Sequence, residues 1–324
     1  MTLNKLTRLA ATCAVVALMG GAAVAQEVTL KLGHLANEEN IWHKAAMKFA
    51  EEAKALTEGR VEVQIYPNES LGKEIDLING MQLGTADMTI TGESLQNWAP
   101  SAALLALPYA YKSLEHMDEV ASGEVGKQIE AEIIEKADIR PLTYFARGPR
   151  NLSATRAITT PDELNGFKLR VPNVPIFVAA WQAIGANPTP MAFSEVFTSL
   201  QNGTIEGQEN PLALFKSGGF YEVQKVVNKT EHVRSWIYLT ISERSWNKLS
   251  EADQAALMEA GKRTQAYERE LFLADEDALV ADLEGRGVTF VEVDKAAFAA
   301  KARDAVLGAV AEEIRPLAEA IFNN

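Results

Sequence analysis

The spacing of apolar residues along the chain switches repeatedly between a two-residue and a three-to-four-residue period. Val28, Leu30 and Leu32 alternate with polar residues, which predicts a first strand. The elements predicted in the first third are a strand over 28–32, an amphipathic helix over 39–56, a strand over 61–65, a helix from 71 to 84 and a short buried strand over 88–91. This order predicts a mostly parallel sheet with helices on both faces.

The same alternation of periods recurs further along the chain. The predicted elements are a helix over 115–136, a strand over 139–145, a capping box over 160–163, a strand over 168–171, helices over 176–184 and 194–201, and a strand over 238–242. A long helix begins after Ser250 and extends to Leu283, a length of about 50 Å at 1.5 Å per residue. Such a helix could run across two lobes as a spine.

The predicted fold class is therefore α/β, with two lobes, a cleft between them and the long helix spanning both. The expected division is 26–147 plus 236–275 for the first lobe and 148–235 plus 276–324 for the second. In open α/β sheets, ligands bind beyond the carboxyl ends of strands and often between domains.

The first 25 residues have the pattern of a cleaved secretory signal peptide. Lys5 and Arg8 form a basic segment, an apolar run follows, and Ala23–Ala25 has the A-x-A cleavage pattern. The alternative is a retained membrane anchor, for which the run is short. Cys13 lies inside this segment, so a mature chain of about 299 residues would contain no cysteine and no disulfide or thiol nucleophile.

The negative net charge of the chain makes some classes of binding partner improbable. Removing Lys5 and Arg8 lowers the net charge from −13 to −15, which opposes binding to nucleic acid and to anionic lipid. No second stretch of 18 apolar residues is present, so the mature protein is expected to be soluble. An anionic ligand would need a local cationic pocket.

Arg150, Arg170 and Asn210 are the candidate residues for such a pocket. They lie in GPRN (148–151), FKLRVPN (167–173) and EGQENP (206–211). A guanidinium offers a rigid donor fork that fits a carboxylate, and an amide both donates and accepts. No nucleophile or general base is evident beside them, which favours capture of an organic acid over its transformation.

Several motifs together resemble one known family. PTPMAFSEVFTSLQNGTIEGQENPL (188–212), TPDELNGFKLRVPN (160–173), LGKEIDLINGMQLGTADM (71–88) and LALPYAY (105–111) are similar to the extracytoplasmic solute receptors of TRAP transporters, the DctP family. The resemblance implies a periplasmic protein of the two-lobed, type II-like kind that closes on an organic acid. It also implies delivery to the small and large permease subunits, driven by an ion gradient, with no cofactor and no catalysis. A monomer is expected.

The resemblance also assigns residues to the ligand. The family's carboxylate-binding arginine falls on Arg170, its second arginine on Arg150 and its amide on Asn210, while the acidic residue after the L-G turn falls on Glu74. The set implied for the ligand is completed by His34 and Asn37 from the first-strand loop, Phe193 as an aromatic wall, and Glu93 and Gln96 from the 92–97 stretch.

Each assignment has a structural alternative. Arg170 could be a surface charge, Asn210 a turn residue before Pro211, and Glu74 an acid that complements a helix dipole. Arg147 competes with Arg150 for the second position. His34 could be a hydrogen-bonded loop residue, and Phe193 could be part of the core.

No metal site is expected, because the four histidines lack H-E-x-x-H spacing. A carboxylate at Glu74 would repel a ligand with acid groups at both ends, so a sugar-derived monocarboxylate, a uronate or an aldonate, is the favoured ligand class. An N-acylneuraminate and a C4-dicarboxylate or 2-oxoacid are alternatives within the family. Outside it, a sugar-acid hydrolase or lyase would need a carboxylate pair, for which Glu74, Glu93 and Glu209 are candidates. A sensory input protein would share the same pocket.

Overall fold

The computed structural model describes residues 28–323. The predicted signal peptide lies outside these residues. Among the helices of this described part, none combines the length and the apolar character that crossing a membrane requires.

The order of elements follows the alternation expected from the sequence. The strands are β1 (Val28–Gly33), β2 (Val61–Tyr66), β3 (Met88–Thr91), β4 (Ile139–Ala154), β5 (Lys168–Val171), β6 (Asn187–Pro190), β7 (Gly207–Pro211), β8 (Val226–Ser242) and β9 (Thr289–Val291). The helices are α1 (Ile41–Leu56), α2 (Glu74–Leu83), α3 (Leu114–Ser122), α4 (Glu124–Ala137), α5 (Pro175–Ile184), α6 (Phe193–Gln201), α7 (Leu212–Ser217), α8 (Glu243–Trp246), α9 (Glu251–Gly285), α10 (Lys295–Ala309) and α11 (Arg315–Asn323), with short 3₁₀ turns between some of them.

The described strands form one mixed sheet in the order β2-β1-β3-β8-β4-β7-β5-β6, with β9 beside β8. The two ends are parallel, but β3 pairs with β8, and β4 with both β7 and β8, in antiparallel fashion. The prediction of a mostly parallel sheet is therefore wrong at the centre. The antiparallel partners lie far apart in the sequence, so no local sequence pattern predicts their pairing.

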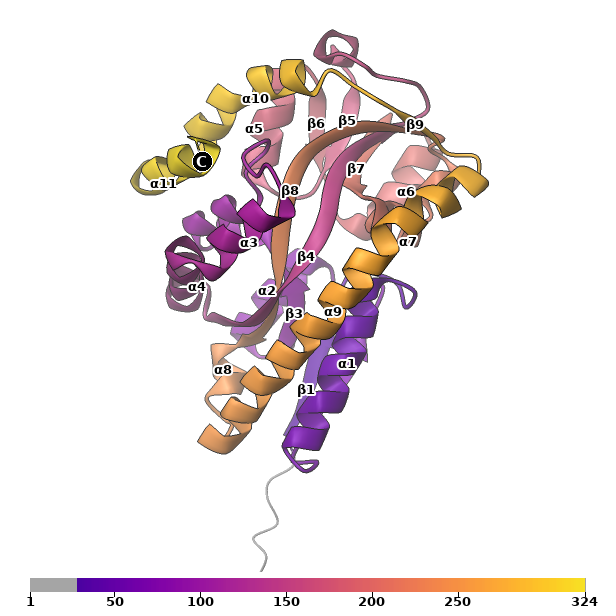
Figure 1. Cartoon of the computed structure of the whole chain (residues 1–324). Helices are drawn as coiled ribbons and strands as arrows, with labels where there is room; N and C mark the ends of the chain where they lie inside the picture. The colour runs from indigo at the N-terminus through magenta and orange to yellow at the C-terminus, as the bar shows by residue number, and fades with distance from the viewer. Residues whose placement is uncertain (1–27, 324) are drawn as a thin grey trace, which may run out of the picture.

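Strands β4 and β8 are the long central pair and join the two halves of the molecule (Figure 1). The first end of β4 pairs with the end of β8 that borders β3, and its last residues pair with β7. The strand predicted over 139–145 continues to Ala154, past Gly148 and Pro149. The register shifts between Arg147 and Arg150 and again between Arg150 and Leu152, so the strand bends where these turn-forming residues lie.

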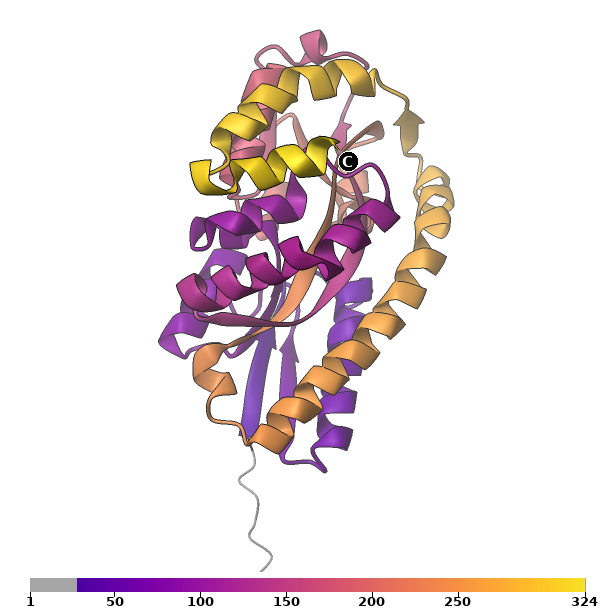
Figure 2. The same ribbon diagram turned by 60° about the vertical axis from the view of Figure 1, so that its left-hand side comes forward.

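Helix α9 is the predicted spine. It has 35 residues, about 50 Å, and begins after Ser250, whose side chain accepts a hydrogen bond from the backbone N–H of Asp253. It packs against α1 and β4 and runs diagonally along both halves (Figures 1 and 2). Gly148 of β4 lies against the carboxylate of Glu276 on this helix, and an added Cβ there would displace that side chain.

The single helix predicted over 115–136 is two helices, α3 and α4. Gly123 separates them with extended backbone, at φ −84° and ψ −165°, and its N–H bonds the carbonyl of Val120. A side chain at Gly126 would meet the carbonyl of Ala121. The apolar stripe continues across the break, which is why its period alone predicts one helix.

The described part of the chain has two apolar clusters, of which the larger spans both halves. The larger extends from β1–β3 and α1 through the central strands to α5 and α10. The smaller gathers side chains of α6, α7, the end of α9 and β9. Polar side chains gather beside the larger cluster, where residues of β4, β5 and β7 meet β3 and the start of α2 around one cavity.

Candidate functional site

A cavity of about 350 Å³ lies between the two halves. Its polar lining includes Glu69, Lys73, Glu74, Thr91, Glu93, Ser94, Arg147, Arg150, Arg170, Asn173, Glu195 and Asn210. Leu35, Trp42, Ile90, Pro172, Met191, Phe193 and Leu214 are among its apolar walls. An apolar-walled cleft with a few convergent polar groups is the usual form of a site for a small molecule.

Three buried arginines reach this cavity from two strands. Arg147 and Arg150 come from β4, and Arg170 from β5; their exposed fractions are 7%, 2% and 3%. The Nη2 of Arg147 is ion-paired with Glu93, and its Nε donates to Ser235 Oγ at 2.7 Å. Arg147 and Arg150, the two candidates for the second arginine of the site, thus both line the cavity.

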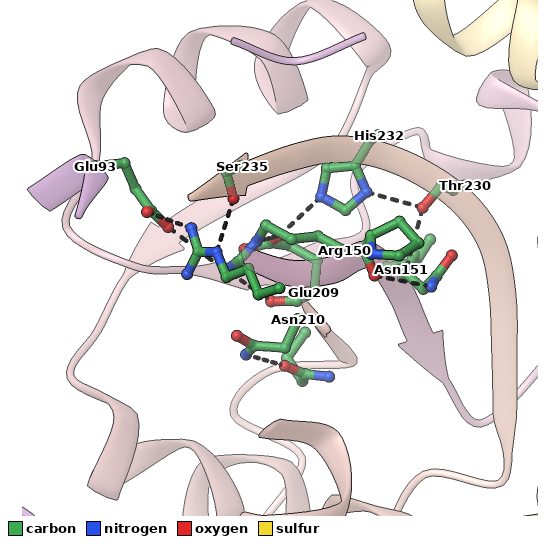
Figure 3. A network of polar contacts seen from close by, with 12 residues as sticks. Glu93, Arg150, Asn151, Glu209, Asn210, Thr230, His232 and Ser235 are labelled. Atoms are coloured by element: carbon green, nitrogen blue, oxygen red, sulfur yellow. Dashed lines mark hydrogen bonds and ion pairs between the residues drawn. The ribbon is translucent and has the colours of Figure 1, made fainter. Parts of the chain in front are cut away.

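Arg150 is held by a second carboxylate behind the wall. Its Nε and Nη2 donate to the two oxygens of Glu209 at 2.5 and 2.7 Å, and Nη2 also donates to the Glu209 carbonyl (Figure 3). The Nη1 lies 3.5 Å from Glu93, and the guanidinium stacks over the ring of Phe177. Burial alone would lower the pKa of Arg150, but Glu209 outweighs it and raises that pKa.

His232 extends the network and orients Glu209. Its Nε2 lies 2.8 Å from Glu209 Oε2 and its Nδ1 lies 2.9 Å from Thr230 Oγ1 (Figure 3). Burial lowers the pKa of His232 in spite of Glu209, so the ring is neutral. Burial alone would raise the pKa of Glu209, but Arg150 and His232 together lower it to about 2. An ionised Glu209 can only accept, so Nε2 carries the proton and Thr230 donates to Nδ1.

Arg170 differs from the other two arginines. Its Nε and Nη2 both donate to the backbone carbonyl of Met191, at 3.0 and 2.6 Å. In the described part of the chain, no carboxylate lies within ion-pair distance of it. Burial lowers the pKa of Arg170 to about 10, so it stays charged at neutral pH. A buried cation held only by a carbonyl keeps N–H donors and positive charge that an anion could satisfy.

The remaining polar wall contains carboxyl and amide groups. Thr91 Oγ1 donates to Glu74 Oε1 at 2.7 Å, and enclosure of this carboxyl group, reinforced by Glu93, raises the pKa of Glu74. Asn210 Nδ2 donates to Gln208 Oε1 at 2.6 Å. These groups can accept from or donate to hydroxyl groups.

Of the nine residues predicted to contact a ligand, six line the cavity: Arg170, Arg150, Asn210, Glu74, Glu93 and Phe193. His34, Asn37 and Gln96 do not. His34 is buried beside His43, with 3.2 Å between Nε2 and Nδ1.

Asn37 and Gln96 make other contacts. Asn37 Nδ2 donates to the Ser217 carbonyl of α7 at 3.1 Å, and Gln96 Oε1 accepts from the N–H of Ile176 at the start of α5 at 3.3 Å. The structure thus uses both amides for bonds between segments distant in the chain. Their polar, loop-based sequence context does not distinguish that use from ligand contact.

Several residues of the site were not predicted as ligand contacts, namely Arg147, Glu209, His232, Lys73 and Trp42. Glu209 stands next to Asn210 in a strand, and the alternation of side chains sends it to the opposite face. That alternation is the only local signal for its role. His232 is 23 residues away, and nothing local ties it to Glu209.

A family model described as bacterial extracellular solute-binding protein, family 7 (DctP), matches residues 32–313. A solute-binding protein of Roseobacter denitrificans is 67% identical over 323 residues, which cover 99% of this chain and 98% of that protein. A solved structure of that TRAP periplasmic solute binding protein contains L-galactonate. Its TM-score is 0.90 at 69% identity, over 92% of this chain and 99% of that chain.

Two more distant proteins are also similar. A TRAP periplasmic solute binding protein from Xanthobacter autotrophicus Py2, solved with β-D-galacturonate, has a TM-score of 0.87 at 28% identity, over 91% of this chain and 99% of that chain. A sialic acid-binding periplasmic protein of Vibrio cholerae is 30% identical over 294 residues, which cover 90% of each protein.

Proposed function

Since the chain belongs to the bacterial extracellular solute-binding proteins of family 7, the receptors of TRAP transporters, we propose that its cavity captures a sugar-derived monocarboxylate, an aldonate or a uronate. The observation that carries this proposal is the state of Arg170. Its guanidinium faces the cavity and is buried, charged and without a carboxylate partner among the described residues.

The ligand carboxylate supplies the missing counter-charge. The Nη1 of Arg170 and the second hydrogen of its Nη2 remain for a bidentate pair, since Met191 takes the other donors. Arg150 already binds Glu209, so it contributes mainly positive potential and its Nη1. Arg170 is therefore the main residue that binds the ligand carboxylate, and Arg150 strengthens this binding through its positive charge.

The acidic wall selects hydroxyl groups at the other positions of the ligand. Glu74, Glu93 and Asn210 accept hydrogen bonds from a polyol, and Glu74 can also donate when it is protonated. A second carboxylate on the ligand would have to approach these acids. The Roseobacter relative holds L-galactonate and the Xanthobacter protein holds galacturonate, which supports the hydroxylated monoacid over a dicarboxylate.

The same premise supports two further proposals, on the place of action and on the lobe division. We place the mature protein in the periplasm, where it hands its ligand to the TRAP permease subunits without chemical change. The low pKa of Glu209, about 2, makes it a poor proton donor for hydrolysis. A division at 147/148, 235/236 and 275/276 agrees with the pairing of β3 to one end of β8 and of β7 to the opposite end of β4.

An N-acylneuraminate is the second candidate, favoured by the Vibrio relative. It carries one carboxylate and several hydroxyl groups, so it meets the same electrostatic requirements.

Ligand-dependent thermal stability followed by calorimetry tests the proposal. L-galactonate, galacturonate, glucuronate, N-acetylneuraminate and succinate would be compared on the protein after unfolding and refolding to remove any retained ligand. A hexonate or uronate at 100 times its Kd should stabilise the fold by about 2.7 kcal/mol. Selective binding of succinate, or release of a chemically altered acid, would contradict the proposed function.

A further inference from the structure

Residues 67–73, here called the strap, join β2 to α2 along the edge of the cavity. Asn68 and Glu69 both have left-handed backbone, at φ 57° and 54°, which is an energetically costly conformation for residues other than glycine. Their N–H groups bond the carbonyls of Ala36 and His34 at 3.0 and 3.1 Å. This turn fixes the strap so that Glu69 and Lys73 both line the cavity.

The strap contacts the first turn of α6, which belongs to the opposite half. Lys73 Nζ lies 2.7 Å from Glu195 Oε1, and Glu69 Oε2 accepts from the N–H of Ser194 at 3.2 Å. Glu195 is itself oriented, because its Oε2 accepts from the N–H of Ala192 at 3.3 Å. A carboxylate at the start of a helix is also favoured by the helix dipole.

These contacts enclose the same space as Arg170. Glu69, Lys73, Phe193 and Glu195 line one cavity with Arg170, and Met191, which bonds Arg170, lies four residues before Glu195 in the chain. Separation of the two halves must therefore break the Lys73–Glu195 pair. Interactions that exist only in a closed state act on the rate of opening and hence on ligand release.

We infer that the strap and the first turn of α6 form a charge-paired latch that prolongs the residence of the bound acid. This inference rests on the proposed function and concerns how that same site is regulated. Within the described residues, the latch makes no hydrogen bond to Arg170 or to the Glu209 network, although the charges of Glu69 and Glu195 act on Arg170 across the cavity. It sets the release rate, while Arg170 sets the choice of a carboxylate.

A double-mutant cycle with Lys73→Met and Glu195→Gln tests the latch in the full mature protein. Glutamine keeps the acceptor for the Ala192 N–H. Release of L-galactonate, or of the uronate that binds best, is followed by stopped-flow displacement with the intrinsic tryptophan fluorescence, to which Trp42 in the cavity wall contributes. Because both side chains are about half exposed, each single variant should release about two- to five-fold faster, and the double variant no faster than the singles.

Lys301→Met and Asp162→Asn form the matched control. This exposed pair has the same 2.7 Å separation, but it joins α10 to the turn before β5, within one half. Its loss should leave release unchanged. Added salt should accelerate release from the wild type but not from Lys73→Met.

The outcomes separate the latch from the proposed function. A wild-type protein that binds none of the sugar acids overturns the proposed function and the latch with it. A wild-type protein that binds, with release rates equal in wild type and cycle variants, overturns the latch alone. Rate effects that multiply in the double variant would also overturn it, because they would show that the two side chains act independently.

Discussion

The three arginines of the cavity meet the need for a counter-charge in different ways. Arg147 is paired with Glu93 and Arg150 with Glu209, so the charges of both arginines are neutralised within the protein. Arg170 has only a carbonyl. A buried charge that lacks an ionic partner is costly unless a ligand supplies it, so this residue couples binding to charge neutralisation.

Arg170→Ala should weaken sugar-acid binding by about 100-fold or more, roughly 3 kcal/mol, because the ligand carboxylate loses its partner inside a buried site. Arg170→Lys keeps the charge but not the fork, and an intermediate loss of about 10-fold is expected. Titration calorimetry measures both, with the more exposed Arg156→Ala as control. Near-normal affinity in Arg170→Ala would refute the assignment.

Glu209 supports the site from behind by neutralising Arg150. Its pKa of about 2 lies below the ordinary value of 4.5, so its contribution to stability is full above about pH 4.5 and is lost as the pH falls toward 2. The sequence could place Asn210 at the cavity but not this network, since Arg150 and Glu209 lie 59 residues apart. Strand alternation indicates only that Glu209 faces away from Asn210.

Glu209→Gln should lower the free energy of unfolding at pH 7 by about 3 kcal/mol, because Arg150 loses its closest charge partner. The variant should also lose less stability than the wild type between pH 4.5 and pH 2.5. Urea unfolding across this range gives both quantities. The exposed Glu292→Gln should behave as wild type, and a Glu209→Gln curve parallel to the wild type would argue against a shifted carboxylate.

At the scale of elements, local patterns predicted α1, α2, α5, α6, α9 and at least part of six strands, because periodicity and caps are encoded within a few residues. They merged α3 with α4 and did not predict α7, α8, α10, α11, β6, β7 or β9. Ser250 begins α9 as predicted, and the Thr160 box is present on a short 3₁₀ turn. The pairing of β4 with β8 was not foreseeable, since it joins segments more than 80 residues apart. Sheet direction is decided by such long-range pairs.

The spine helix also carries a buried acid, Glu268, whose carboxyl group is opposed by burial more than it is helped by Arg269 and the backbone of Ala146. Both carboxyl oxygens of Glu268 lack hydrogen-bond partners in the described structure, and burial raises the pKa of Glu268 to about 8. Because the pKa of Glu268 is raised, its contribution to the free energy of unfolding is full below about pH 4.5 and declines as the pH rises to about 8. The buried Glu268 therefore lowers the stability of the folded protein near neutral pH.

Glu268→Gln should raise the free energy of unfolding at pH 8 by about 2–4 kcal/mol relative to wild type and change it little at pH 4.5, because the amide never ionises. Urea midpoints at the two pH values measure the difference. Glu284→Gln, on an exposed position of the same helix, is the control. Equal effects at both pH values would show that packing, not ionisation, governs this position.

The whole molecule combines a net charge of −13 with a site for an anion. The cavity lining itself mixes acids with the arginines, so positive potential is confined to the depth of the cleft. The approach of a carboxylate is thus opposed at long range and favoured only on contact. This arrangement disfavours fast electrostatic steering.

The association rate of the sugar acid should therefore rise about two- to three-fold between roughly 20 and 300 mM NaCl, since salt screens the long-range repulsion. Stopped-flow fluorescence at several ligand concentrations separates association from release. A neutral polyol in the same salt series would report viscosity and specific-ion effects. A rate that falls with salt would show that the arginines dominate the approach.

Strands β4 and β8 and helix α9 each cross between the halves, so neither half is a continuous piece of chain. The sheet of β1–β3 has to wait for β8 to be synthesised before its inner edge is covered. We therefore expect a nascent polypeptide with this topology to complete its sheet only after β8 has emerged from the ribosome. For a protein of an extracytoplasmic family, late completion keeps the chain threadable during export.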